Sequence, residues 1–311
     1  MERAATNLAC RSSEELAPTA LALRRDRLRV VDFFELTKPR MNFLVVVTTM
    51  VGFYLAGRGT GTHWLLLLHT LAGTALTAAS ASVLNHWMEA HLDARMPRTR
   101  NRPLPTGRVL PAEALVFGVG LGVAGIVYLL WLVNPLTAGL GALTHLTYVL
   151  IYTPLKRLSS LNTLIGAIPG AIPPLMGFTA VDNALSPGAW LLFAVLFLWQ
   201  MPHFLAIAML YRDDYAAAGF KMLPVVDQTG SATGRMVVLY ILALIPVTLL
   251  VVPLRITSPA YLLAALSLGA VFLWYGCKLW RSRDRADARK LFYASIIYLP
   301  LLLASMLIFK L

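Results

Sequence analysis

Three oxygen-bearing side chains recur at every fourth position near the end of an apolar stretch of the sequence. They are Asn85, Glu89 and Asp93. On a helix, residues with this spacing stack on one face, roughly 6 Å apart per step. Carboxylate and amide oxygens suit Mg²⁺, which proteins usually bind through one or two carboxylates together with substrate phosphate oxygens. The spacing therefore predicts an oxygen-lined stripe that binds a magnesium ion.

An arginine-rich loop follows this stripe directly. Its five arginines are Arg95, Arg98, Arg100, Arg102 and Arg108. Guanidinium groups bind phosphate oxygens in bidentate fashion, and ionisable residues at the mouth of a membrane helix are functional candidates. The combination predicts a magnesium diphosphate site at a membrane surface. The structural alternative is that the loop is an ordinary positively charged flank of a membrane helix and that the Asn and Glu merely end that helix.

A second polar face is predicted further along the chain. Gln200, His203, Tyr211 and Asp214 fall at helical spacing, so they would line one side of a helix from mid-membrane to its end. Several polar groups in a few residues of a membrane helix are costly and are functional candidates. The alternatives are that Asp213 and Asp214 only stop the helix and that His203 is a satisfied core residue.

Composition indicates a polytopic membrane protein. The 311 residues are 58% hydrophobic and 14% charged, with a mean hydropathy of +0.68, which is too apolar for a soluble domain. The net charge of +12 does not indicate a nucleic-acid partner, because the charges lie in short loops between apolar spans. Nine stretches are long enough to cross the bilayer. They are 42–58, 64–87, 114–133, 135–153, 161–180, 189–211, 236–253, 259–280 and 291–309.

The distribution of cations predicts the orientation of these spans. If the amino terminus and every second loop share one side, that side holds 24 of the 27 Lys and Arg residues. By the positive-inside rule the amino terminus is cytoplasmic and the carboxyl terminus lies outside. We expect a flexible cytoplasmic tail over 1–28, an interfacial helix near Val30–Leu36, and a single transmembrane domain over 29–311. Three prolines, Pro169, Pro173 and Pro174, predict a bent helix beside the site.

Several stretches together resemble a known family. The chain is similar to the intramembrane UbiA-type prenyltransferase superfamily in the Asn85, Glu89, Asp93 stripe and in further segments from about Leu36 to the last span. Two of these segments, Trp199–Phe204 and Met222–Pro224, point to the branch that farnesylates haem. The other matching segments are Arg98–Pro105, Tyr152–Arg157, Asp213–Tyr215 and Ala218–Gly219.

The resemblance implies an all-α fold with nine transmembrane helices in a bundle around a central cavity that opens laterally to lipid. It implies farnesyl diphosphate and haem B as substrates, haem O and diphosphate as products, and Mg²⁺ as the cofactor. The expected location is the cell (inner) membrane, and the expected protein partner is a haem A synthase or a terminal oxidase assembly. For His203, the partner that we consider is a porphyrin iron or a propionate.

The resemblance also assigns roles residue by residue. It implies a catalytic group that holds the metal and the diphosphate from two sides, and the metal ligands within this group would be Asn85, Glu89, Asp93 and Asp214. The catalytic group is Asn85, Glu89, Asp93, Asp213 and Asp214. The substrate-binding residues are Lys38, Arg98, Arg102, Tyr152, Lys156, Arg157, Gln200, His203 and Lys221. Aromatic faces, with Tyr148, Tyr152 and Trp199 as candidates, could stabilise an allylic cation.

Two departures from the family pattern leave the number of metal ions open. Glu89 stands where the superfamily usually has Asp, and Ala90-His91 replaces a frequent Arg-Asp pair. The second motif has Ala217 and Ala218 where another Asp would stand. Two other functions remain open at this point. One is prenylation of an aromatic quinone precursor, which would leave His203 without a role. The other is transport, for which a site nearer the membrane midplane is expected.

Overall fold

The computed structural model describes residues 29–57 and 63–311, so the predicted tail over 1–28 lies outside the described residues. Within the described part of the chain, nine helices are long and apolar enough to cross a membrane, as predicted. The long helices are α2 (Pro39–Ala56), α3 (Trp64–Asp93), α4 (Pro111–Leu132), α5 (Pro135–Leu146) with its continuation, α7 (Asn162–Asp182), α8 (Pro187–Leu210), α11 (Ser231–Leu249), α12 (Tyr261–Ser282) and α13 (Arg285–Ile308). The multi-pass all-α prediction is therefore confirmed.

Helix α3 is longer than its predicted span. It has 30 residues, or about 45 Å at 1.5 Å per residue, and it continues beyond position 87 to Asp93. Asn85, Glu89 and Asp93 consequently lie on one continuous helix, and all three are buried on it. The predicted oxygen-lined stripe is thus a real helix face at the end of the bundle where α3 terminates, which we call the motif end.

The fourth span changes helix type near its end. After α5, residues Thr147–Tyr152 form the π-helix η1, and Thr153–Leu158 form α6. In η1 the Thr153 amide donates to the Tyr148 carbonyl, five residues back. A π-helical turn inserts an extra residue into the helical repeat and is frequent at functional sites. It changes the direction of the side chains that follow, among them Thr153 and Lys156, relative to a regular α-helix.

Helix α7 forms the centre of one half of the molecule. It is the most buried span, and it runs through Pro169, Pro173 and Pro174 as one continuous helix. It packs closely on α2 at two glycines. A Cβ on Gly52 would lie 2.1 Å from the Pro174 carbonyl oxygen, and one on Gly177 would lie 1.9 Å from the Thr49 carbonyl oxygen. These glycines allow backbone contact between the two helices.

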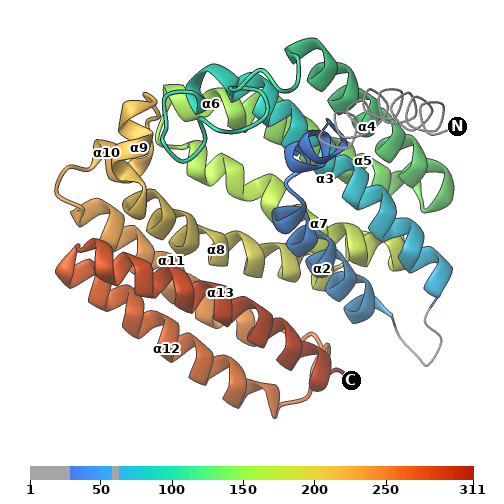
Figure 1. Ribbon diagram of the computed structural model, residues 1–311. Coiled ribbons are helices and arrows are strands. Elements are labelled where there is room, and N and C mark those ends of the chain that lie inside the picture. Colours follow the sequence, from blue (N-terminus) through green and yellow to red (C-terminus); the bar gives the residue numbers. More distant parts are fainter. Residues whose placement is uncertain (1–28, 58–62) are drawn as a thin grey trace, which may run out of the picture.

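The helices form two adjoining groups. The first contains α2 to α7, and the second contains α8, α11, α12 and α13, with α7 packed on α8 between them. Figure 1 shows the short helices α6, α9 (Arg212–Ala217) and α10 (Leu223–Val226) gathered at one end of the bundle, and the carboxyl terminus at the other. At that opposite end Lys310 donates to the carbonyls of Tyr54 and Gly57 and thereby joins the chain's last residues to α2.

Residues 29–36 are helical, as predicted, and precede α2. Leu36 is fully buried against α3 and α4, while Val30, Val31 and Phe34 are exposed. Arg108 binds this helix to the arginine-rich loop through Asp32. An apolar outer face beside charged contacts is the expected pattern of an interfacial helix.

Candidate active site

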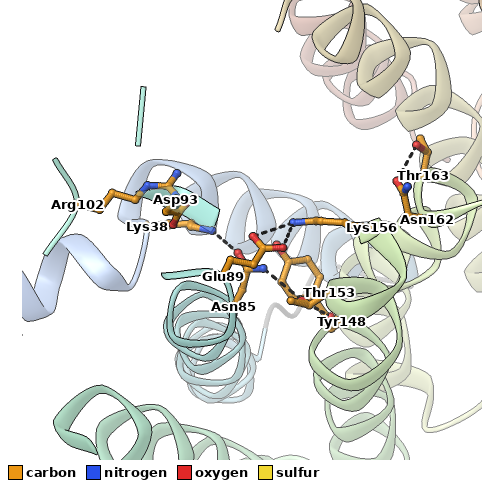
Figure 2. Close-up of polar contacts among 10 residues, drawn as sticks. All are labelled: Lys38, Asn85, Glu89, Asp93, Arg102, Tyr148, Thr153, Lys156, Asn162 and Thr163. Atoms are coloured by element: carbon orange, nitrogen blue, oxygen red, sulfur yellow. Dashed lines mark hydrogen bonds and ion pairs between the residues drawn. The ribbon is translucent and has the colours of Figure 1, made fainter. Parts of the chain in front are cut away.

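Each member of the stripe is paired with a cation from a different part of the chain. Asn85, Glu89 and Asp93 are buried, with 1%, 6% and 2% of their surfaces exposed. Lys38 Nζ donates to Asn85 Oδ1 at 2.8 Å, and Arg102 Nη1 donates to Asp93 Oδ2 at 2.7 Å. Figure 2 shows Lys38 and Arg102 on one side of the stripe and a third cation, Lys156, on the other. The cluster therefore combines hard oxygen donors with groups that neutralise phosphate charge.

Lys156 forms the third pair. Its Nζ donates to Glu89 Oε1 at 2.8 Å and to Oε2 at 3.1 Å. The same ammonium lies 4.7 Å from the ring centroid of Tyr152 and 5.8 Å from that of Phe220. The aromatic faces stabilise the ammonium by cation–π attraction where water is scarce. A charged group held in this way is preorganised to bind an anion.

Lys38 is held in an unusual backbone conformation just before α2. It has φ 50° and ψ 58°, the left-handed region that costs energy for a residue with a side chain. Pro39 follows it, so the chain turns there into the first span. Burial, together with the nearby Arg102 and Lys156 cations, lowers the pKa of Lys38 to about 7. Lys38 therefore loses its proton readily near neutral pH, and a bound anion would raise its pKa again.

A hydrogen-bonded chain fixes the orientation of Asn85. Asn85 Nδ2 donates to Thr153 Oγ1 at 3.3 Å, and Thr153 Oγ1 donates to the Tyr148 carbonyl at 2.9 Å. Asn85 therefore presents its oxygen toward Lys38 and its nitrogen toward Thr153, the first residue of α6. Thr153 was not singled out from the sequence, because a threonine at the end of an apolar span carries no signal without knowledge of the π-helical turn.

The ends of α3 and α8 meet at the motif end. Leu92 and Met96, at and after the end of α3, pack in one cluster with Ala208 of α8 and with Phe220 beyond it. The Arg98 guanidinium lies 4.8 Å from the ring centroid of Tyr211, the residue that follows α8. The two sequence motifs therefore lie side by side on the same side of the bundle.

The second aspartate pair is placed differently from the stripe. Both residues lie on α9. Asp213 is 76% exposed and pairs with Arg285 Nη2 of α13 at 2.7 Å. Among the described residues, neither Asp213 nor Asp214 forms a hydrogen bond or an ion pair with Asn85, Glu89 or Asp93. Their predicted part in diphosphate binding remains a prediction.

The remaining predicted residues lie on α6, on α8 and in the segment after α9. Gln200 is buried and packs against Gly170 of α7, where a Cβ would lie 2.0 Å from Gln200 Oε1. His203 contacts α13, where its Nδ1 lies 2.7 Å from Ser295 Oγ. Arg157 and Lys221 are exposed at the motif end. The Lys221 amide donates to the Lys156 carbonyl at 2.8 Å, which joins the segment after α9 to α6.

The donor set fits a magnesium ion that is bound together with a phosphorylated substrate. Among the described residues no group of three or more His, Cys, Asp and Glu side chains could hold a metal ion. Asn85, Glu89 and Asp93 instead offer two carboxylates and one amide oxygen. Mg²⁺ commonly binds one or two carboxylates and completes its octahedron with water and phosphate. The chemistry of these oxygens therefore suits Mg²⁺ rather than a softer metal.

One residue beside the stripe was missed from the sequence. His86 is 97% buried, since 3% of its surface is exposed, and neither ring nitrogen has a hydrogen-bond partner among the described residues. A histidine next to Asn85 on an apolar helix gave no reason to assign it a role. Its burial without a partner is visible only in the folded chain.

Fold and cluster together define a class of protein: polytopic membrane proteins with a buried cluster of oxygen donors and cations at one end of a helix bundle. Solved structures of this architecture match the chain closely. One, described as a digeranylgeranylglyceryl phosphate synthase, has a TM-score of 0.76 at 18% identity and covers 90% of this chain and 98% of its own. Another, a UbiA homolog from Archaeoglobus fulgidus bound to GPP and Mg²⁺, has a TM-score of 0.63 at 13% identity and covers 88% and 99%.

The family follows from the sequence comparisons. The model of the UbiA prenyltransferase family matches residues 45–302, so this chain belongs to that family and is a prenyltransferase. A relative from Solibacter usitatus, named protoheme IX farnesyltransferase, is 45% identical over 287 residues and covers 89% of this chain and 98% of its own length. A relative of the same name from Myxococcus xanthus is 46% identical over 276 residues, with 88% and 93% covered.

Proposed function

We propose that this prenyltransferase transfers the farnesyl group of farnesyl diphosphate to a vinyl group of haem B, giving haem O and diphosphate. The observation that carries the proposal is the identity of 45–46% to relatives named protoheme IX farnesyltransferase over about nine-tenths of the chain. The cluster at the motif end supplies groups for such a reaction, because Lys38, Arg102 and Lys156 surround the oxygen stripe.

The cations of the cluster would act on the leaving group. Breaking the allylic C–O bond places negative charge on the diphosphate and positive charge on the farnesyl chain. Preorganised cations stabilise the first charge most strongly where water is excluded, and Lys38, Arg102 and Lys156 are held in place before substrate arrives. Glu89 and Asp93, with Asn85, would hold Mg²⁺ against the diphosphate, where the ion would act as a Lewis acid on the phosphate oxygens.

Aromatic residues beside Lys156 would act on the other charge. The rings of Tyr148 and Tyr152 lie 5.1 Å apart, centroid to centroid, on η1. Their faces are suited to an allylic cation by the same attraction that holds the Lys156 ammonium. The vinyl group of the porphyrin attacks the allylic carbon, and water completes the hydroxyethylfarnesyl substituent, so the reaction requires no protein nucleophile.

The site's position implies how substrates reach it. The diphosphate would bind at the membrane surface and the farnesyl chain would extend into the bundle. We place the motif end on the cytoplasmic side of the cell membrane and the carboxyl terminus outside, because the loops at the motif end hold most of the Lys and Arg residues. The product would pass to a haem A synthase or a terminal oxidase assembly.

The test is a product assay in membranes that contain this protein. Haem B, farnesyl diphosphate and Mg²⁺ are incubated with these membranes, and the expected result is a farnesylated haem identified by mass. Asp93→Asn should abolish product formation, whereas His91→Asn, an exposed neighbour on α3, should not. Product with a hydroxybenzoate and none with haem would overturn the proposal in favour of quinone-precursor prenylation.

A further inference from the structure

The imidazole of His203 is held on three sides by α8 and α13. Trp199 stacks on the ring at 5.0 Å with an interplanar angle of 21°, and Phe292 stacks on it at 5.2 Å and 28°. Nδ1 lies 2.7 Å from Ser295 Oγ. The two stacked rings and the hydrogen bond at Nδ1 therefore fix the orientation of the imidazole. The His203 side chain is nevertheless only half-buried.

Ser295 decides which nitrogen carries the proton. Its Oγ lies 2.6 Å from the Phe292 carbonyl oxygen, which can only accept. A serine hydroxyl has a single proton, and this contact uses it. Ser295 Oγ must then accept a hydrogen bond from the N–H at Nδ1 of His203. In a neutral imidazole with its proton at Nδ1, Nε2 carries an unshared lone pair.

The position of Ser295 makes this arrangement rigid. Ser295 is fully buried, and its backbone carbonyl accepts a hydrogen bond from Trp199 Nε1 at 2.9 Å. One residue of α13 thus fixes both the histidine, through its hydroxyl, and the ring that stacks on it, through its backbone. Stacking by Trp199 and Phe292, together with the contact to Ser295, therefore favours the ring orientation in which Nδ1 faces Ser295.

The lone pair fixed on Nε2 indicates which part of a porphyrin His203 could bind, the iron or a propionate. A propionate would need a donor N–H, and at Nε2 this tautomer has none. An iron centre needs an electron-pair donor whose other nitrogen is held by a hydrogen bond, which is the usual arrangement of metal-ligating histidines. We propose that His203 Nε2 is an axial ligand of the haem iron of the substrate, and that Ser295 is the positioning residue that fixes its tautomer. This inference rests on the proposed function.

Haem binding to the purified full-length protein tests it without turnover. The protein in nanodiscs is titrated with haem B, and the Fe–His stretching band of the ferrous complex is followed by resonance Raman spectroscopy together with the Soret spectrum. The wild type should show the band. His203→Ala should remove it, and His203→Gly should regain a histidine-like spectrum when imidazole is added.

Variants of Ser295 separate positioning from packing. Ser295→Ala should weaken haem binding about tenfold and shift the Fe–His band, because loss of an outer hydrogen bond to a ligating histidine typically costs 10- to 100-fold in metal affinity. Ser295→Thr keeps the hydroxyl and should restore both readouts. Ser305→Ala is the matched control, since Ser305 is a buried serine on the same helix whose Oγ bonds the carbonyl three residues back but contacts no histidine.

The outcomes separate the inference from the proposed function. If haem binds and His203→Ala leaves the Fe–His band unchanged, the inference is wrong while the function stands. If His203→Ala binds haem more weakly but its spectrum is unchanged, His203 contacts a propionate. That result also overturns the inference that His203 is an axial ligand. If the wild type binds no haem and forms no farnesylated haem, the proposed function itself fails.

Discussion

Lys156 Nζ donates to both carboxylate oxygens of Glu89, at 2.8 Å and 3.1 Å, across 67 positions of sequence. Both side chains are largely buried, with 14% and 8% exposed. An unpaired charge at such a depth is costly, so removing either partner leaves the other uncompensated. The pair therefore connects α3 to α6 and at the same time holds a cation at the site where negative charge would develop.

We expect Lys156→Met to lower kcat/KM for farnesyl diphosphate roughly 100-fold, because a preorganised group that stabilises transition-state charge is lost. The measurement is steady-state product formation in membranes. Lys278→Met is the matched control, since Lys278 is an exposed lysine of α12 that pairs with Asp287. The double variant Glu89→Gln with Lys156→Met should recover thermal stability but not activity. Equal activity of Lys156→Met and wild type would contradict this role.

The backbone of Lys38 allows its charge to be removed without strain. Glycine adopts positive φ freely, so Lys38→Gly keeps the turn before α2 and deletes only the side chain. We expect activity to fall at least ~10-fold while the thermal stability of the detergent-solubilised protein is unchanged or higher. Lys38→Arg, which keeps a positive charge, should retain more activity than Lys38→Gly. If all three proteins were equally active, the ammonium would have no part in the reaction.

Gly170 makes room for Gln200. Because a Cβ at Gly170 would meet Gln200 Oε1 at 2.0 Å, Gly170→Ala should displace the amide and lower both stability and activity. The reference variant is Gly120→Ala on α4, where a Cβ would meet nothing within 4 Å. Thermal unfolding in detergent should show a lower midpoint for Gly170→Ala only. Adding Gln200→Ala should restore the midpoint if the clash is the cause.

Asp227 supports the start of α11, and its effect should depend on pH. Burial raises the pKa of Asp227, but hydrogen bonds from Thr233 and Thr229 outweigh it, so the pKa lies below its usual value. A depressed folded-state pKa gives stability that is present above the ordinary pKa of about 3.9 and is lost as the pH falls through the folded-state value.

Asp227→Ala should therefore destabilise the protein at pH 7 by about 1 kcal/mol or less, because the site is near the surface and screened. The difference from wild type should shrink as the pH falls below about 4. The measurement is the midpoint of thermal unfolding across a pH series. Asp227→Asn keeps one acceptor and should be less destabilised than Asp227→Ala at pH 7, and its difference from wild type should also shrink at low pH because only the wild type titrates at this position. A pH-independent difference for Asp227→Ala would refute the argument.

Much of the architecture was predictable because a membrane imposes it. A span must be apolar, about 20 residues long and internally hydrogen-bonded, so hydropathy and loop charge were enough to predict nine helices. The stripe was predictable for a similar reason, since the four-residue spacing of Asn85, Glu89 and Asp93 places them on one face of any helix. Proline positions alone did not say that α7 would run unbroken through Pro169, Pro173 and Pro174.

The tertiary structure alone decided the partners of these residues. The sequence by itself determined the membrane-embedded class, the nine spans found in the described part of the chain, and the oxygen-lined face. It did not determine that Lys156 pairs with Glu89, that Asp213 pairs with Arg285, or that Ser295 holds His203. These contacts join positions 67 to 92 residues apart, and they depend on how helices pack and on a π-helical turn that redirects side chains. Local spacing fixes which face a residue occupies, whereas only packing fixes what that face meets.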